Sequence, residues 1–177
     1  MATTYVGTRG IDTGWWIKHG LIGGIVAGIS MMIVEMIIAA LMGMDAFMPP
    51  RMIAGIALGK SAMDPSTPLM TAALSGMLLH IVLSIVYGVI FALVVANIRA
   101  VQAPAAVIVA GAVYGLLLWL INFYIIAPPA GWVWFPTMAN PVQQVISHVI
   151  GFGLVLGVYF GRAVTFRHHG IGAAARA

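Results

Sequence analysis

The stretch "GIVAGISMMIVEMIIAA", residues 24–40, holds a single acidic side chain, Glu35, in an otherwise apolar run. The apolar run extends from 21 to 42, and a helix of about 20 apolar residues crosses the ~30 Å hydrocarbon core of a bilayer. An acidic side chain near the middle of such a helix costs about 2.5–3.5 kcal/mol on insertion scales, so it is expected to face protein. The stretch therefore predicts a membrane-spanning helix with a carboxyl group turned inward.

Three further stretches are long and apolar enough to span a bilayer, at 69–96, 105–127 and 141–161. Proline or a capping residue opens each of them: Thr67 and Pro68, Pro104, and Asn140 before Pro141. The first span is too long for a signal-peptide core and is expected to be retained. The stretch at 49–60 is too short to span and predicts a short helix at the outer interface.

The composition supports a membrane protein and excludes several other classes. The chain has 177 residues, of which 62% are hydrophobic and 7% charged, with mean hydropathy +1.08, whereas a soluble domain carries about 25% charged residues. There is no cysteine, which excludes disulfides, zinc–thiolate sites, iron–sulfur clusters and covalent haem attachment. The basic residues lie in tails and loops, which suits lipid headgroups and not nucleic acid. Nucleophile-elbow, phosphate-loop and HExxH motifs are missing, so the chain is not expected to be an enzyme.

The distribution of Lys and Arg predicts the orientation, because basic residues favour the cytoplasmic side of a membrane. Six lie on one side of the predicted spans (Arg9, Lys18, Arg99, Arg162, Arg167 and Arg176) and two on the other (Arg51 and Lys60). Both termini are therefore expected in the cytoplasm of a bacterial cell, with the chain in the inner membrane. The loop "GWVWFPTMANP", residues 131–141, then lies outside, where its aromatic rings are expected at the interface.

An internal repeat relates the two halves of the chain. At an offset of 87 residues, 24–40 aligns with "GAVYGLLLWLINFYIIA" (111–127), so that Glu35 lies over Asn122. At an offset of 68, "HIVLSIVYG" (80–88) aligns with "HVIGFGLVL" (148–156), chiefly through His80 and His148. Two spans per unit make the repeat parallel. The predicted fold is an all-α, four-helix membrane bundle built from two tandem parallel hairpins in a single domain.

The few polar residues of the spans are expected to meet inside the bundle. At 100° per residue, Glu35 shares a helix face with glycines, as does Asn122, and glycine marks close approach of another helix. His80 lies on a small-residue face with Tyr87 nearby, and His148 shares a face with Gln144. Counted at about 1.5 Å per residue, Glu35, His80, Asn122 and His148 lie roughly 20–27 Å from the inner helix ends. The predicted polar cluster is Glu35, Tyr87, His80, Asn122, Gln144 and His148, and the predicted packing glycines are Gly24, Gly28, Gly111, Gly115, Gly153 and Gly157.

On this count Gly153 and Gly157 lie on a different face from His148. Four roles for the cluster stay open. In the first role, Glu35 and His80 form a hydrogen bond that fixes helix register. In the second, the same pair handles protons or ions. In the third role, His80 and His148 would hold a b-type haem as its axial ligands. Imidazole with methionine thioethers binds Cu(I), since eight of the 12 methionines fall on the outer half (Met42, Met44, Met48, Met52, Met63, Met70, Met77 and Met138). His168 and His169 are expected in a solvated basic tail.

The runs "GLIGGIVAGISMMIVE", "LHIVLSIVYGVIFALV" and "SHVIGFGLVLG", with a glycine-rich third span before a proline loop, resemble the YagU-type family of small bacterial inner-membrane proteins. The resemblance covers most of residues 20–161. It implies four membrane helices and no established biochemical activity. This chain has Gln143 and Gln144 before its fourth-span histidine, where an acidic residue is missing.

Together these patterns predict a non-enzymatic accessory or structural membrane subunit. Glycine-lined faces in excess of what four helices need predict association into a homo-oligomer or a larger membrane complex. A haem-carrying redox subunit and a small proton or copper transporter are the alternatives.

Overall fold

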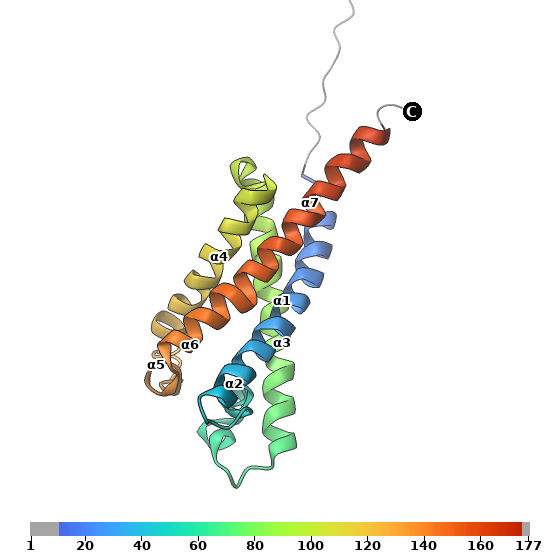
Figure 1. The fold of residues 1–177 in the computed structure, drawn as a ribbon. Helices are drawn as coiled ribbons and strands as arrows, with labels where there is room; N and C mark the ends of the chain where they lie inside the picture. The colour runs from blue at the N-terminus through green and yellow to red at the C-terminus, as the bar shows by residue number, and fades with distance from the viewer. Residues whose placement is uncertain (1–10, 175–177) are drawn as a thin grey trace, which may run out of the picture.

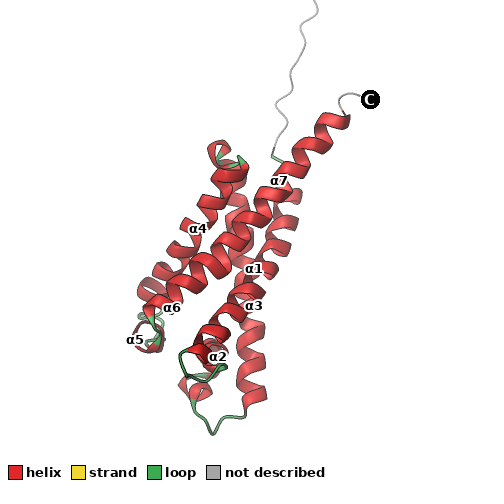
Figure 2. Cartoon of the chain, in the orientation of Figure 1, coloured by secondary structure: helices red, strands yellow, loops and turns green. Residues whose placement is uncertain are grey.

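The computed structural model describes residues 11–174, with side chains up to Arg167. Within that range the regular elements are all helices, joined by loops, and there is no strand (Figures 1 and 2). Four helical rods dominate. They are α1 (Thr13–Leu41), α3 (Leu69–Asn97), α4 (Pro104–Leu120) with its π-helical extension η3 (Ile121–Ile126), and the continuous α6 (Pro141–Ile146), η4 (Ser147–Leu154) and α7 (Val155–Ala174). Short helices join them: α2 (Met48–Leu58), η1 (Lys60–Met63), η2 (Arg99–Val101) and α5 (Trp134–Met138). The four-helix fold class is confirmed.

The rods form two hairpins, each made of two antiparallel helices, and the hairpins lie against each other. The first joins α1 to α3, and the second joins α4 to the α6–η4–α7 rod. Figure 1 shows the start of α1 and the end of α7 at one end of the bundle, with α2 and α5 at the other. Helix α1 packs against η4 and α7, whereas α3 and α4 contact each other only weakly.

The surface of the rods is that of a membrane protein. Isoleucines spaced four apart along α1 (Ile25, Ile29, Ile33, Ile37) are exposed, and so are α3 residues at the same spacing (Leu74, Leu78, Val82, Val86, Ile90, Val94). Polar side chains of the rods are instead buried (Glu35, His80, Ser84, Gln143, Gln144, Ser147, His148). Apolar residues outside and polar residues inside suit lipid as the solvent, and four helices are long and apolar enough to cross a bilayer.

Helix ends follow local sequence in most places. The Asp12 carboxylate accepts from the Trp15 amide at 3.1 Å, and α1 therefore begins eight residues before the predicted 21. Asn140 caps α6 as predicted, accepting from the amides of the two residues after Pro141. The prediction for Thr67 was wrong. Pro68 occupies the position before α3, and the Thr67 hydroxyl donates to the Ser61 carbonyl at 2.6 Å.

Glycines bring the helices of the first hairpin into backbone contact. A Cβ at Gly24 would meet the Ser84 carbonyl oxygen of α3, and one at Gly88 would meet the Gly20 carbonyl oxygen of α1. A Cβ at Gly28 would lie 2.5 Å from the Ser84 hydroxyl. Close approach of this kind is what small residues provide in membrane helix pairs.

The second hairpin is joined in the same manner. A Cβ at Gly111 would meet the carbonyl oxygen of Gly153, and one at Gly115 would meet the carbonyl oxygen of His148. Gly157 lies against the backbone of Ile108, 2.8 Å from where its own Cβ would be. His148 and Gly153 thus approach the same helix.

The contact with Gly115 is made by the His148 backbone carbonyl, so the expectation that the His148 side chain and the Gly153–Gly157 stripe lie on different faces stays a prediction. That expectation assumed 100° per residue throughout the fourth rod. The π-helical segment η4 contains both His148 and Gly153, and a π-bulge lengthens the hydrogen-bonded turn and changes the register of the residues that follow. The chain offers no sequence signal for this segment.

Aromatic packing fills the half of the bundle that holds the start of α1 and the end of α7. Phe160 stacks on Trp16 with ring centroids 5.9 Å apart and meets Phe91 edge-on at 5.5 Å. Around them lie fully buried Val95, Val107, Phe152 and Leu156. This half of the bundle is therefore closed by side chains, whereas the end near α2 and α5 is not.

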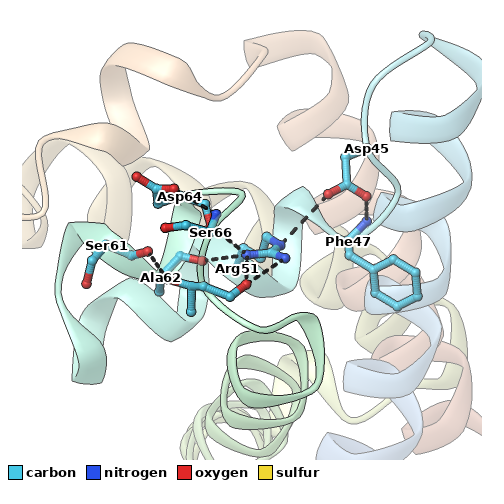
Figure 3. A network of polar contacts seen from close by, with 8 residues as sticks. Asp45, Phe47, Arg51, Ser61, Ala62, Asp64 and Ser66 are labelled. Carbon is cyan, nitrogen blue, oxygen red and sulfur yellow. Dashed lines mark hydrogen bonds and ion pairs between the residues drawn. The ribbon is translucent and has the colours of Figure 1, made fainter.

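A buried arginine organises the connection between α2 and α3 (Figure 3). Arg51, on α2, donates through Nη1 to the carbonyls of Ala62 (3.1 Å), Asp64 (3.1 Å) and Thr67 (3.2 Å), and its Nε lies 3.9 Å from the Asp45 carboxylate. The exposed Asp64 carboxylate accepts from Ser66, and these hydrogen bonds hold the pKa of Asp64 below its usual range. Helix α2 is pressed against α3, since a Cβ at Gly76 would meet a backbone carbonyl oxygen of α2. Its placement in a membrane interface stays a prediction.

Candidate functional site: a polar cavity between the hairpins

A cavity of about 340 Å³ lies between the two hairpins at the α2–α5 end. It exists because α1 packs tightly on η4, where Gly151 meets Met31, while α3 and α4 diverge on the other side. The two short helices roof it. The Trp134 indole N–H of α5 donates to the Met52 carbonyl of α2 at 3.1 Å. Trp134 is only 6% exposed, so this ring is buried against α2. The place of the 131–141 loop at a membrane interface stays a prediction.

The walls of the cavity are mostly apolar. Aromatic and methionine side chains dominate them (Phe123, Trp132, Phe135, Phe152, Met31, Met44, Met48, Met52 and Met138). Met44 and Met138, at the rim, are exposed. A largely apolar pocket of this size with a few placed polar groups is typical of small-molecule sites.

All six members of the predicted polar cluster line this one cavity: Glu35, His80, Tyr87, Asn122, Gln144 and His148. They come from α1, α3, η3, α6 and η4, so every rod contributes. The two π-helical segments supply Asn122 and His148. Such segments occur often at functional sites because they expose backbone groups and re-aim side chains.

Glu35 is 3% exposed and has two glutamine neighbours from α6. The Gln143 amide donates to the Glu35 backbone carbonyl at 3.2 Å. The Gln144 side chain is the hydrogen-bonding neighbour of the Glu35 carboxyl group, and its own Oε1 is buried without a partner. Among the described residues no Lys, Arg or His forms an ion pair with Glu35.

The two histidines bond to backbone carbonyls, not to Glu35. His80 Nε2 lies 3.0 Å from the Gly28 carbonyl oxygen, and His148 Nδ1 lies 2.9 Å from the Gln144 carbonyl oxygen. A carbonyl only accepts, so each of these nitrogens carries the proton. The expected Glu35–His80 hydrogen bond is therefore wrong, and the groups that face Glu35 come from α6.

A second polar pair closes the side of the cavity toward the bundle core. The Tyr87 hydroxyl donates to Asn122 Oδ1 at 2.8 Å, and the Tyr114 hydroxyl donates to the Tyr87 backbone carbonyl at 2.9 Å. These contacts link α3 to α4 and η3 where the two rods begin to separate. They fix the inner boundary of the cavity.

A b-type haem does not fit this arrangement. The Nε2 of His80 is already turned to the Gly28 carbonyl, so only its Nδ1, the ring nitrogen nearer the backbone, is left for an iron. A Cβ at Gly28 would also contact Ser84, so there is no slot for a macrocycle between α1 and α3 at this level. Within the described part of the chain, no group of three His, Asp or Glu residues is placed to hold a metal ion.

Sequence reasoning missed several residues of the site. Gln143 was noticed only as a departure from a family pattern, yet it bonds the backbone of Glu35. Ser84 lines the cavity and is 2% exposed. The signal for Gln143 was present, because a glutamine inside an apolar span faces protein. No comparable signal marked the roof formed by α2 and α5.

Comparison of the chain with protein-family models, with curated proteins and with solved structures found no match. The arguments for function therefore come from the cavity itself.

Proposed function

We propose that this chain is a small non-enzymatic membrane protein that binds a small organic molecule in the cavity between its hairpins. The single observation that carries the proposal is a mostly apolar cavity of about 340 Å³ into which polar groups from all four rods converge. Polar side chains inside a membrane bundle are costly unless they serve packing or a site. Packing alone does not explain a cavity that they leave unfilled.

Binding of this kind suits an accessory or structural subunit, the role that the composition favours. We place the protein in a bacterial inner membrane with both termini in the cytoplasm, on the basis of the basic residues, so that the cavity opens toward the outside. The similar glycine contacts of the two hairpins support the internal repeat. The likeness to YagU-type proteins stays a prediction.

Equilibrium dialysis of radiolabelled 2-phenylethanol against the protein in lipid nanodiscs tests the proposal, with empty nanodiscs correcting for partition into lipid. The parent should retain the probe, and Ile56→Trp, which fills the cavity wall, should not. Ile25→Trp is the matched control, because Ile25 lies on the exposed face of α1. Equal retention by all three proteins and by empty nanodiscs would refute a binding cavity.

Cu(I) is a second candidate, because five of the cavity-lining residues are methionines and thioether with imidazole suits that ion. His148 adds an Nε2 that is free of the backbone. Replacing Met48 and Met52 by Leu should then weaken Cu(I) binding in a competition with a chromogenic chelator. Unchanged Cu(I) binding, or none by the parent, would remove this candidate.

A further inference from the structure

Several polar groups that line the cavity can accept a hydrogen bond. His80 uses Nε2–H and His148 uses Nδ1–H on backbone carbonyls, which leaves Nδ1 of the first ring and Nε2 of the second as acceptors. Gln144 Oε1 is an acceptor without a partner, on a side chain only 6% exposed. The Glu35 carboxyl oxygens complete the set.

Two donors of the same region are already used. The Gln143 amide donates to the Glu35 backbone, and the Tyr87 hydroxyl donates to Asn122. A buried acceptor without a donor costs about 1–3 kcal/mol. A ligand that carries N–H groups therefore gains by donating to these acceptors.

The charge of the cavity has one sign. Glu35 is its acidic residue, and among the residues whose side chains the structure describes no lysine or arginine lines it. The nearest basic side chain in sequence, Arg51, is committed to the carbonyls of the 62–67 loop. A carboxylate without a basic partner in a low-dielectric site favours a cationic ligand over a neutral or anionic one.

The walls determine the rest of the ligand. Phe123, Phe135 and Phe152 offer ring surfaces to an apolar body, and aromatic faces attract a cation in addition. Methionine side chains adapt to its shape. The apolar walls therefore favour an amine with a hydrocarbon or aromatic body over an inorganic cation.

We propose that the cavity binds an organic ammonium ion with at least one N–H group and an apolar body, its nitrogen held by Glu35, Gln144 and the open ring nitrogens of His80 and His148. This inference rests on the proposed small-molecule function and specifies its ligand class. Binding needs no covalent step. The ammonium donates to these acceptors and pairs with the carboxylate.

Three probes of one shape test the inference in the nanodisc dialysis: 2-phenylethylammonium, neutral 2-phenylethanol, and N,N,N-trimethyl-2-phenylethylammonium. The primary ammonium should bind the parent about tenfold or more tightly than either of the others, which is the contribution of a charge-assisted hydrogen bond. Glu35→Gln should remove that preference. Asp45→Asn is the matched control, because Asp45 lies outside the cavity lining and should leave the preference unchanged.

The outcomes separate the two proposals. Equal binding of the alcohol and the primary ammonium would overturn the ligand class and leave the binding function intact. Equal binding of the primary and quaternary ions would show recognition by aromatic rings alone and overturn the role of the acceptors. No binding of any of the three by the parent would contradict the binding function itself. The comparison of probes on the parent decides the matter even if Glu35→Gln fails to fold.

Discussion

Replacement of Arg51 should loosen the outer end of the molecule and little else. Its guanidinium lies 6% exposed under the loop that joins α2 to α3 and donates to three backbone carbonyls there. Arg51→Met keeps the apolar stem and removes all of these donors. Arg51→Lys keeps the charge, but a single ammonium lacks the planar fork that reaches several carbonyls.

The magnitude follows from which carbonyls lose a donor. The hydrogen bond to Ala62 is buried, so its stranded oxygen costs about 1–3 kcal/mol. The bonds to Asp64 and Thr67 are partly buried, water can replace them, and together they add about 1 kcal/mol. The 3.9 Å pair with the half-exposed Asp45 adds little. Arg51→Met should therefore lower the free energy of unfolding by about 2–4 kcal/mol, and Arg51→Lys by roughly half of that.

Two measurements check this expectation. Denaturant unfolding in mixed micelles should show the order parent, Arg51→Lys, Arg51→Met. Amide hydrogen exchange should accelerate at residues 62–67 and not in α1. Lys60→Met is the matched control, because it removes the other outer basic charge from an exposed position. Parent-like unfolding and parent-like exchange in Arg51→Met would refute the role of this side chain as the organiser of the loop.

Three further predictions concern the rods. Gly76→Ala should cost about 1–3 kcal/mol or more, because its Cβ would meet a backbone carbonyl of α2 that cannot rotate away. A Cβ at Gly14 would make only an ordinary contact, 3.8 Å from Asp12 Oδ1, so Gly14→Ala should be neutral or slightly stabilising in the same unfolding assay. Glu35→Gln should have the same free energy of unfolding as the parent. Glu35→Leu should lower it by about 1–3 kcal/mol, because the change removes the hydrogen-bonding neighbour of the buried Gln144 side chain. A Leu variant as stable as the parent would contradict the pairing of Glu35 with Gln144. Ser66→Cys should react with an impermeant thiol reagent in intact cells and Ala100→Cys should not; the reverse pattern would invert the predicted orientation.

The four spans and the cap at Asn140 were readable from the sequence because they depend on local properties, whereas the caps at Asp12 and before α3 were not. Helix length follows from the run of apolar residues, and Asn140 before Pro141 marks a helix start whatever lies around it. The membrane topology then forces the polar residues together, since four short-looped spans leave them only one interior. That is why Glu35 and Asn122, a whole repeat apart, could be placed at one end of the bundle in advance.

The features that the sequence did not reveal are the π-helical turns, the partners of the histidines and the contacts of Arg51, and they depend on non-local or cooperative structure. The π-helical turns at 121–126 and 147–154 change the register of the residues that follow them, and no residue type announces them. The partners of His80 and His148 are backbone carbonyls, which every residue possesses, so the sequence could not select them. Arg51 looked like a topological charge and is instead held by the carbonyls of its own loop.

The central claim is that the two hairpins close tightly at one end and leave an accessible cavity at the other. Ala27 and Ala39 test it on one helix, because both are fully buried, Ala27 in the closed core and Ala39 in the cavity wall. The chain has no cysteine of its own, so the rate at which methyl methanethiosulfonate modifies Ala27→Cys and Ala39→Cys in nanodiscs reports each position alone. The account predicts rapid modification at 39 and protection at 27 until the protein unfolds. Equal protection at both positions, or faster reaction at 27, would contradict it.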